Sequence, residues 1–414
     1  MKNNGYSTFV TRHSSLVNHP CSWYRLTPMK RSPLAIIFLT VFIDLLGFGI
    51  VLPLLPFYAE SYGASSFVVG LLLTSYSLMQ FLFTPIWGRL SDRYGRRPLI
   101  IMSLAGSCVG FLIFGLAQTL MTLFIGRTIA GIAGAIIPTT NAYIADVTAP
   151  EERARGMGLV GAAFGLGFIL GPAIGGLLAP YGYSKPVLLA SAIAGLNLIF
   201  ALLKLPESLT EETRSRAQSR SFDLKALDKT LSQPQVMPLL AMYLVVIFAV
   251  ANMEATFGLL NEHRYGLTAR ETGYLFALIG ILMSVTQGLL VGRLARRVGE
   301  RRLIMLGTFS LIFGLGLMPF TPNMPSYCLI LTVMSFGAGI NNPSIAALLS
   351  KSSDVEKQGG IMGIAHSMAS LGRILGPMWG GYAFDALGTA SPFITGGIFM
   401  GLAFLLSLIS LRNQ

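Results

Sequence analysis

Long runs of hydrophobic residues, separated by short polar connections, follow one another along most of the chain. The first run, PLAIIFLTVFIDLLGFGIVLPLLPFY at residues 33–58, contains a single charged residue. About 20 consecutive apolar residues span a bilayer as an α-helix, and a helix satisfies its own backbone polar groups in hydrocarbon. We therefore predict an all-α membrane protein with twelve transmembrane helices, at residues 34–57, 67–87, 98–117, 120–142, 157–179, 185–205, 238–260, 270–292, 303–320, 327–349, 360–382 and 391–411.

The composition agrees with this pattern. Hydrophobic residues make up 53% of the chain and charged residues only 12%, whereas soluble domains have about 25% charged residues. Residues 1–32 are polar and lack the apolar core of a cleaved signal peptide, so we expect a cytoplasmic N-terminal tail. A start at Met29, which opens the sequence MKRSPLAIIF, is an alternative.

The distribution of positive charge predicts the orientation. The net charge of +12 would suggest a nucleic-acid partner in a soluble chain. Here nearly all Lys and Arg residues fall in alternate connections, and the opposite side holds only Lys185, Arg264 and Arg270. The positive-inside rule then places both termini in the cytoplasm. We predict a multi-pass protein of the plasma (inner) membrane, with the lipid bilayer and no nucleic acid as partner.

Two sequence segments recur at nearly the same separation. GRLSDRYGRRPLI (88–100) recurs as GRLARRVGERRLI (292–304), and GLVGAAFGLGFILGPAIGG (158–176) recurs as GIAHSMASLGRILGPMWGG (363–381). Two such pairs indicate a duplicated six-helix half. The predicted organisation is a tail at 1–32, a six-helix bundle at 33–205, a cytoplasmic linker with a short amphipathic helix at 206–237, and a second bundle at 238–414.

Two six-helix halves in parallel repeat, with both termini on one side, resemble the major facilitator superfamily. Four motifs carry the resemblance: GRLSDRYGRRP (88–98) after span two, GRTIAGIAGA (126–135) in span four, GFILGPAIGG (167–176) in span five and DLLGFGIVLPLLP (44–56) in span one. The last two are similar to the drug:proton antiporter branch, which includes tetracycline-efflux-like proteins. The resemblance implies a proton-coupled antiporter that exports small organic solutes by alternating access.

The resemblance also implies a cytoplasmic gate. Asp92 would dock on the start of span eleven, near Gly359–Gly360, with Asp146 as its companion. The second copy of the loop has Arg296 where Asp92 stands, so the gate has no equivalent there. The alternative for the first copy is a basic loop that only sets topology. The predicted gate residues are Gly88, Asp92, Arg93, Gly95, Arg96, Arg97 and Asp146.

The Gly-Pro segment of span five predicts a closely packed, bent helix. Its small residues lie on one face, where another helix can approach closely, and Pro172 removes a backbone hydrogen bond. The alternatives are a bend used in transport and ordinary packing of small residues. The residues concerned are Gly167, Gly171, Pro172, Gly175 and Gly176.

Ionisable residues inside the predicted spans are candidates for proton coupling and solute binding. A charge at the bilayer centre costs about 2.5–3.5 kcal/mol or more, so it normally faces the protein interior. Asp44 and Glu254 are the candidate coupling acids, with Glu254 preferred and a structural bond as the alternative for Asp44. Arg127 would pair with Asp44 or sense an acid. Further candidates for this site are His366, Arg373, Gln80, Asn252 and Asn341.

The remaining candidates differ in how specific their chemistry is. His366 and Arg373 share one helix face, and ordinary packing is the alternative for His366. An unpaired Arg373 would be costly in the membrane, so we expect a carboxylate or an anionic solute as its partner. Span nine, 303–320, lacks the acid that tetracycline exporters carry, so tetracycline is not predicted as the solute.

Other functional classes find little support in the sequence. The chain has no GxxxxGK[ST], GxSxG or HExxH motif and no Cys/His cluster, so we predict no ATP-driven pump, enzyme, catalytic residue, cofactor or metal. The expected partners are a small-molecule substrate and protons, and the protein is expected to be a monomer. Proton-coupled uptake of a sugar or organic acid, and a receptor or scaffold without flux, are the alternatives.

Overall fold

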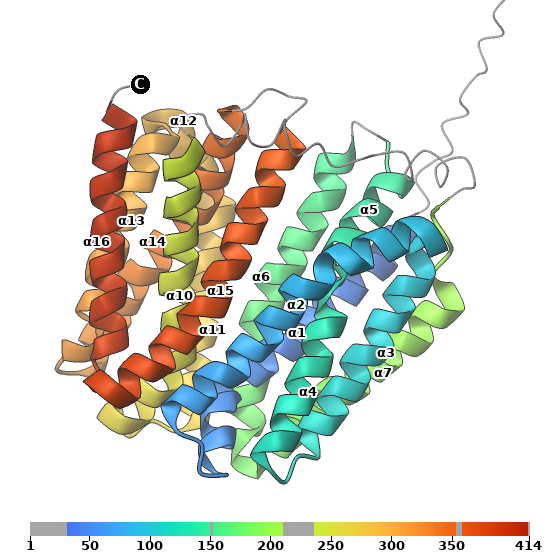
Figure 1. Ribbon diagram of the computed structural model, residues 1–414, viewed down its shortest axis with the longest axis horizontal. Coiled ribbons are helices and arrows are strands. Elements are labelled where there is room, and N and C mark those ends of the chain that lie inside the picture. The colour runs from blue at the N-terminus through green and yellow to red at the C-terminus, as the bar shows by residue number, and fades with distance from the viewer. Residues whose placement is uncertain (1–30, 150–151, 210–235, 353–357, 413–414) are drawn as a thin grey trace, which may run out of the picture.

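The computed structural model describes residues 31–149, 152–209, 236–352 and 358–412, and nearly all of them are helical (Figure 1). Nearly all of the predicted N-terminal tail, and nearly all of the linker with its amphipathic helix, lie outside the described residues; Arg31 and Ser32, predicted as the end of the tail, begin α1. The main helices are α1 (Arg31–Glu60), α2 (Ser66–Tyr94), α3 (Arg96–Gly115), α4 (Leu120–Ala133), α5 (Ile137–Val147), α6 (Arg153–Leu178), α7 (Ser184–Lys204), α10 (Val236–Tyr265), α11 (Ala269–Val285), α12 (Gly292–Val298), α13 (Glu300–Gly316), α14 (Met324–Lys351), α15 (Gln358–Leu387) and α16 (Ser391–Arg412).

The helices of the described residues follow the predicted spans. One of them, α15, is less apolar than a typical transmembrane helix. Eleven helical segments are long and apolar enough to cross a membrane. The predicted span at 360–382 lies in α15, which is 30 residues long but is not among the eleven. Glycine, serine, His366 and Arg373 dilute its apolar character. This composition fits its position, because α15 packs against both α2 and α10.

Two spans are interrupted by non-α turns. In span four the 3₁₀ turn η1 (Gly134–Ile136) separates α4 from α5, because Pro138 at the start of α5 cannot donate a backbone hydrogen bond. In span eight the π-helical turn η4 (Thr286–Val291) joins α11 to α12. Such π turns bend the path of a helix and often occur at functional sites.

Polar side chains fix several helix starts. The Ser65 hydroxyl accepts a hydrogen bond from the Val68 backbone nitrogen at the start of α2. Thr268 and Glu271 form a capping box at the start of α11. These caps satisfy backbone N–H groups that have no partner within the helix, so each helix begins where its cap lies.

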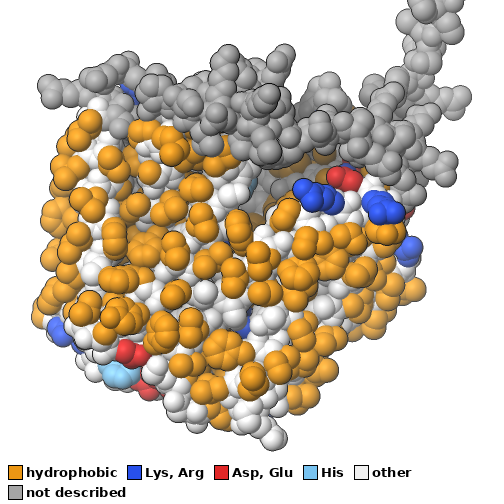
Figure 2. Space-filling view, viewed as in Figure 1, with side chains coloured by type: hydrophobic (Ala, Val, Ile, Leu, Met, Phe, Trp, Pro, Cys, Tyr) orange, Lys and Arg blue, Asp and Glu red, His pale blue; other side chains and the backbone are white. Residues whose placement is uncertain are grey.

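The first six spans (α1–α7) and the last six (α10–α16), here called the two halves, lie side by side (Figure 1). Within the halves, α1 packs on α6 and α10 packs on α15. Across the halves, α2 packs on α15 and α11 packs on α6. We call the end with Tyr94 and Val298 the basic end, and the end with Glu60 and Tyr265 the acidic end. On the face in Figure 2, hydrophobic side chains cover most of the bundle between these ends.

The repeated Gly-Pro segments occupy equivalent places in the two halves. In α6 the positions Gly167, Gly171 and Gly175 face α1, where an added Cβ would meet Leu45, Gly49 and Ile50. In α15 the equivalent glycines face α10 in the same way: Gly372, Gly376 and Gly380. This agrees with the close packing that the sequence predicts. A role of the Pro172 bend in transport stays a prediction.

A second set of glycines lets the two halves touch backbone to backbone near the acidic end. A Cβ added at Gly273 would lie 2.6 Å from the carbonyl oxygen of Pro172 and 2.7 Å from Cα of Gly176. At the other seam, added Cβ atoms at Gly70 and Gly381 would meet the carbonyl oxygens of Pro377 and Ser66. Side chains are therefore excluded from the points where the halves meet.

Near the basic end, glycines of the same spans make no such contact. An added Cβ would meet nothing within 4 Å at Gly161, Gly288, Gly88 or Gly363. The buried hydrophobic residues show the same trend. One cluster includes residues of both halves, whereas a second cluster, which includes Leu99 and Ile144 near the basic end, draws only on the first half. Among the described residues, the close backbone contacts between the halves thus lie toward the acidic end, and these four positions near the basic end make none.

Replacing Gly273 by valine is expected to destabilise this conformation. The new side chain has no space between Pro172 and Gly176, and overpacking of this kind costs about 1–3 kcal/mol. The matched control is Gly401→Val, because Gly401 is a spanning-helix glycine whose added Cβ meets nothing within 4 Å. Thermal unfolding of the detergent-purified variants measures the effect. Equal unfolding temperatures for the two variants would contradict this account of the seam.

Candidate functional site

Asp44 lies in the middle of α1 and is only partly exposed. Its Oδ1 accepts a hydrogen bond of 2.8 Å from the Ser107 hydroxyl of α3. Burial of a carboxyl group without a partner is costly, so Ser107 supplies the polar contact that this position requires. The structural bond to a neighbouring span, one of the two alternatives from the sequence, is therefore present. It leaves a role in coupling open.

Arg127 of α4 is almost fully buried, with 2% of its surface exposed. Its guanidinium carbon lies 4.5 Å from the ring centroid of Tyr76 and 5.8 Å from that of Phe48. Its Nε has no hydrogen-bond partner. Cation–π contacts are strongest where water is excluded. Among the described residues Arg127 forms no recorded ion pair with Asp44, so the two aromatic rings hold it instead.

The second half contributes an acid and a base to the same region. Arg373 of α15 interacts electrostatically with Glu254 and Tyr243 of α10, and also with Tyr76 of α2. Its Nη2 donates a long hydrogen bond of 3.4 Å to the Ser370 hydroxyl. No recorded ion pair among the described residues neutralises Arg373 directly. His366, on the same helix, is exposed and also interacts electrostatically with Arg373.

Tyr76 connects the charged groups of the two halves. Its electrostatic partners are Asp44, Arg127 and Arg373. It packs on Phe48 with ring centroids 5.3 Å apart, and Phe48 in turn packs on Phe168 of α6. We call Asp44, Arg127, Glu254, Arg373 and Tyr76 the central charged cluster. The sequence pointed to four of these residues as ionisable groups within spans, and the structure brings them into one region.

Three further polar residues that the sequence assigned to the same site each contact a neighbouring helix or turn. Asn252 is fully buried, and its Nδ2 donates to the Pro392 carbonyl of α16 at 2.6 Å. Asn341 is fully buried against Gly307 of α13. Gln80 donates to the Gly134 carbonyl of η1 at 2.9 Å. Asn252 and Asn341 thus join helices within the second half. Gln80 lies beside Tyr76, because a Cβ added at Gly134 would meet both the Tyr76 hydroxyl, at 2.5 Å, and Nε2 of Gln80, at 3.6 Å. A role of the three residues in solute binding stays a prediction.

At the basic end, Arg96 gathers the acids of the predicted gate. Its Nη1 donates to Oδ1 of Asp92 at 2.5 Å and to the Ser91 hydroxyl at 2.7 Å. Its Nε donates to Oδ2 of Asp146 at 3.3 Å. Asp92 and Asp146, which the family resemblance paired, therefore share Arg96. The Asp92 side chain is 42% exposed and Gly360 is also exposed, so docking of Asp92 near Gly359–Gly360 stays a prediction.

The other predicted gate residues hold the turn between α2 and α3. Gly95 has φ of +112°, a conformation that favours glycine. Arg97 donates from Nη2 to the Leu202 carbonyl of α7 at 2.9 Å, and Arg93 lies over the Tyr94 ring at 5.4 Å. Gly88 has open space beside it.

The sequence interpretation missed Glu207 at this turn. Its carboxylate accepts hydrogen bonds from the backbone nitrogens of Arg96 at 2.9 Å and Arg97 at 3.1 Å. These are free N–H groups at the start of α3, and an acid is favourable there. Glu207 lies more than one hundred residues away in the sequence, so no local spacing signals the contact.

The sequence interpretation also missed Asp385, at the acidic end. Its two carboxylate oxygens accept from the backbone nitrogens of Ser66 at 3.2 Å and Phe67 at 2.8 Å. An α15 side chain of the second half thus caps the N-terminus of α2 in the first half. The available signal was its place near the C-terminus of its own helix, where a negative charge is unfavourable.

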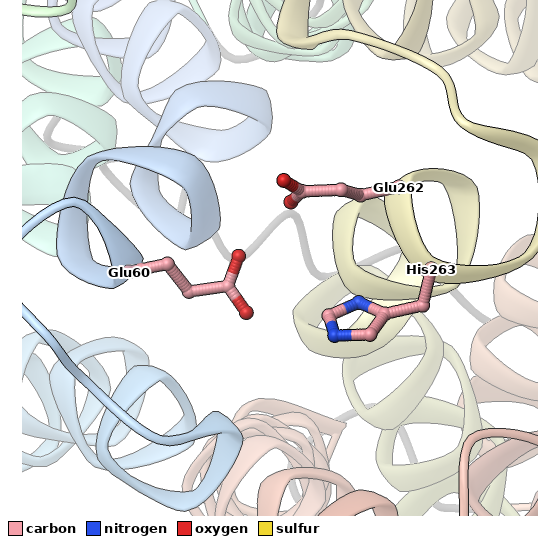
Figure 3. A group of neighbouring side chains, drawn as sticks. All are labelled: Glu60, Glu262 and His263. Atoms are coloured by element: carbon pink, nitrogen blue, oxygen red, sulfur yellow. The ribbon is translucent and has the colours of Figure 1, made fainter.

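Three more titratable side chains meet at the acidic end: Glu60, Glu262 and His263 (Figure 3). One ligand atom from each lies within 4.8 Å of the others. Nδ1 of His263 donates to the Leu259 carbonyl at 3.0 Å. Glu60 belongs to the first half and the other two to the second. The pair of carboxyl groups is able to share a proton, and we assign no metal to it.

Comparisons with known proteins identify the family. The family model of the Major Facilitator Superfamily matches residues 37–324 and 263–413. The chain belongs to the major facilitator superfamily. As a member, it is a membrane transporter and not an enzyme.

Several proteins of this superfamily are similar over most of their length. Multidrug resistance protein 2 of Bacillus subtilis (strain 168) is 32% identical, covering 87% of this chain and 90% of the relative. Tetracycline resistance protein, class C, of Escherichia coli is 34% identical over 84% of this chain and 89% of the relative. The crystal structure of the human organic anion transporter MFSD10 (TETRAN) matches with a TM-score of 0.69 and 26% identity, covering 92% of this chain and 100% of that chain.

Replacing Tyr76 by leucine is expected to destabilise the transporter, whereas Tyr76→Phe is expected to behave like the parent protein. Leucine removes the ring beneath the Arg127 guanidinium, and a desolvated cation–π contact is worth about 2 kcal/mol. Phenylalanine keeps the ring. Thermal unfolding in detergent reports the difference. An unfolding temperature for Tyr76→Leu equal to that of Tyr76→Phe would show that the ring does not hold Arg127.

Proposed function

We propose that this transporter is a proton-coupled antiporter that exports a small, drug-like organic solute by alternating access. The observation that carries the proposal is the position of the central charged cluster. Acids and bases from both halves meet in the middle of the bundle, and the halves are in backbone contact toward the acidic end. In transporters of this class the solute and the coupling ion bind near the membrane midplane, between the repeats.

The relatives support export of a drug-like solute. They include proteins named for multidrug and tetracycline resistance, and resistance arises when a solute leaves the cell. The structural relative named as an organic anion transporter is consistent with the two arginines of the cluster. The absence of an acid in 303–320 leads us to exclude tetracycline itself from the proposal.

The proposed setting is the inner membrane, with the basic end facing the cytoplasm and both chain termini on that side. The positive-inside rule supports this orientation, because the Arg-rich loops at 88–97 and 293–302 lie at the basic end. We propose a monomer with two units, 33–205 and 238–414, joined by the linker at 206–237. Because the backbone contacts between the halves lie toward the acidic end, we infer that in this orientation the described conformation opens to the cytoplasm.

We assign proton coupling to Glu254. It is partly exposed, and Arg373 interacts with it electrostatically without a recorded ion pair among the described residues. A proton on Glu254 and a cationic group of a solute would compete for the same carboxylate, which is the requirement for antiport. Asp44 is less suited because the Ser107 hydroxyl holds its carboxylate. It remains the second candidate.

A solute screen tests the direction of transport. In an efflux-deficient host, expression is expected to lower accumulation of a drug-like solute, and a protonophore is expected to restore it. Higher accumulation on expression would instead support uptake of a sugar or organic acid. Absence of any flux under any ion gradient would support a receptor or scaffold.

The substitution Glu254→Gln is expected to lower pH-gradient-driven flux in proteoliposomes at least about tenfold, the scale of a coupling free energy of 1–3 kcal/mol. The amide keeps the size of the side chain but does not titrate. The matched control is Glu271→Gln, at an exposed capping position of the same half. Full gradient-driven transport by Glu254→Gln, with normal expression, would rule out Glu254 as the coupling acid and direct attention to Asp44.

A further inference from the structure

The helices α2 and α15 end in the same four-residue pattern. Asp92 is followed by Gly95, and Asp385 is followed by Gly388, each in the order Asp-x-x-Gly. Both glycines have positive φ, +112° and +99°, so each ends its helix in a conformation that favours glycine. In both helices the aspartate lies two residues before the last helical residue.

An aspartate at this position is unfavourable for its own helix. The carbonyl groups of the last turn are already partly negative, and a carboxylate beside them is repelled. The charge is favourable only if the N-terminus of another helix, or a cation, lies within reach. In both helices the aspartate is therefore more favourable when it contacts the N-terminus of another helix or a cation than when it lies beside its own helix C-terminus.

The packing of α2 on α15 supplies that partner. The two helices run in opposite directions, so the C-terminus of each lies at the same end as the N-terminus of the other. At the acidic end the contact is formed. Asp385 accepts from the backbone nitrogens of Ser66 and Phe67, and Phe67 packs edge-on against Tyr382. Further along the same two helices, toward the central charged cluster, Thr74 donates to the Ile374 carbonyl at 3.0 Å.

At the basic end the acid is held away from such a contact. Asp92 bonds to Arg96, in the first turn of the helix that follows. Arg96 thus provides a cation for the acid while this end is open. One of the two Asp-x-x-Gly ends caps the opposite half, and the other is paired within its own half.

We propose that α2 and α15 form a two-ended clamp in which Asp385 gates the acidic end as the counterpart of Asp92. The inference rests on the proposed alternating access. When the acidic end opens, Asp385 leaves Ser66 and Phe67; when the basic end closes, Asp92 leaves Arg96 for the start of α15. One interhelical cap is lost as the other forms, so the free energies of the two conformations stay close.

Cysteine labelling of purified protein in liposomes tests the clamp without any measurement of transport. In a background with Cys21, Cys108 and Cys328 replaced by serine, Thr74→Cys reports on access past the acidic end to the α2–α15 seam, and Gly363→Cys reports on the basic end. Thr74 is buried at the seam, and Gly363 is exposed with open space beside it. A maleimide probe is expected to react slowly at position 74 and fast at position 363.

The substitution Asp385→Asn is expected to raise the labelling rate at position 74 about fivefold or more, because loss of a cap of this kind changes a population by that factor. The rate at position 363 is expected to fall. Asp92→Asn should shift both rates in the opposite direction, and the double variant should return toward the parent rates. Glu271→Gln is the matched control, because Glu271 caps its own helix at the same end.

A second variant tests the same contact independently, in case Asp385→Asn fails to fold. Ser66 is the first residue of α2, where proline is tolerated. The substitution Ser66→Pro removes the backbone N–H that donates to Asp385 and leaves the Asp385 carboxylate in place. It is expected to raise the rate at position 74 as well. The clamp is refuted if the folded variants label like Glu271→Gln, or if Asp385→Asn and Asp92→Asn shift the rates in the same direction. The predicted labelling without any solute flux would refute the proposed function and leave the clamp standing.

Discussion

The close approach of backbones between the two halves is the constraint on which the structure depends. At the acidic end α6 meets α11, and α2 meets α15, at glycines whose missing side chains leave room for the opposite main chain. Apolar helices gain little from burial away from lipid, so their association relies on van der Waals packing and on polar contacts between helices. The Asp385 cap adds such a polar contact at this end.

The charged residues follow from the same arrangement. Arg127 and Arg373 are expensive in hydrocarbon, and each lies among aromatic or acidic groups instead of facing lipid. The first half supplies Asp44 with Arg127, and the second supplies Glu254 with Arg373. In the proposed function, a solute at this cluster would meet both signs of charge. Such a site would suit organic molecules with ionisable groups, and its charge would change when one acid takes up a proton.

Much of the fold was predictable from the sequence because the bilayer imposes a simple rule. The hydrophobic runs predicted the helices, and the repeated segments predicted that α6 and α15 occupy equivalent places. The predicted span at 360–382 is less apolar than the others because α15 lies between other helices. Four of the five residues of the central charged cluster were predicted because they are ionisable residues inside hydrophobic spans.

The tertiary partners of single side chains were less predictable. From the sequence, Asn252 and Asn341 were candidates for lining the solute-binding site, and in the structure each is buried against a neighbouring helix. Glu207 and Asp385 cap helices that are distant in sequence, and only the folded chain brings them there. Asp385 had a local signal in its Asp-x-x-Gly ending, which becomes informative once the antiparallel partner of α15 is known.

Paired distance measurements between spin labels in liposomes test the central claim most directly. One pair joins exposed positions at the acidic end, Ser61 and Leu387, and the other joins Tyr94 and Lys351 at the basic end. The account predicts that, when pH or solute shifts the population, the first distance lengthens while the second shortens. Two distances that lengthen together, or a change at one end alone, would contradict it.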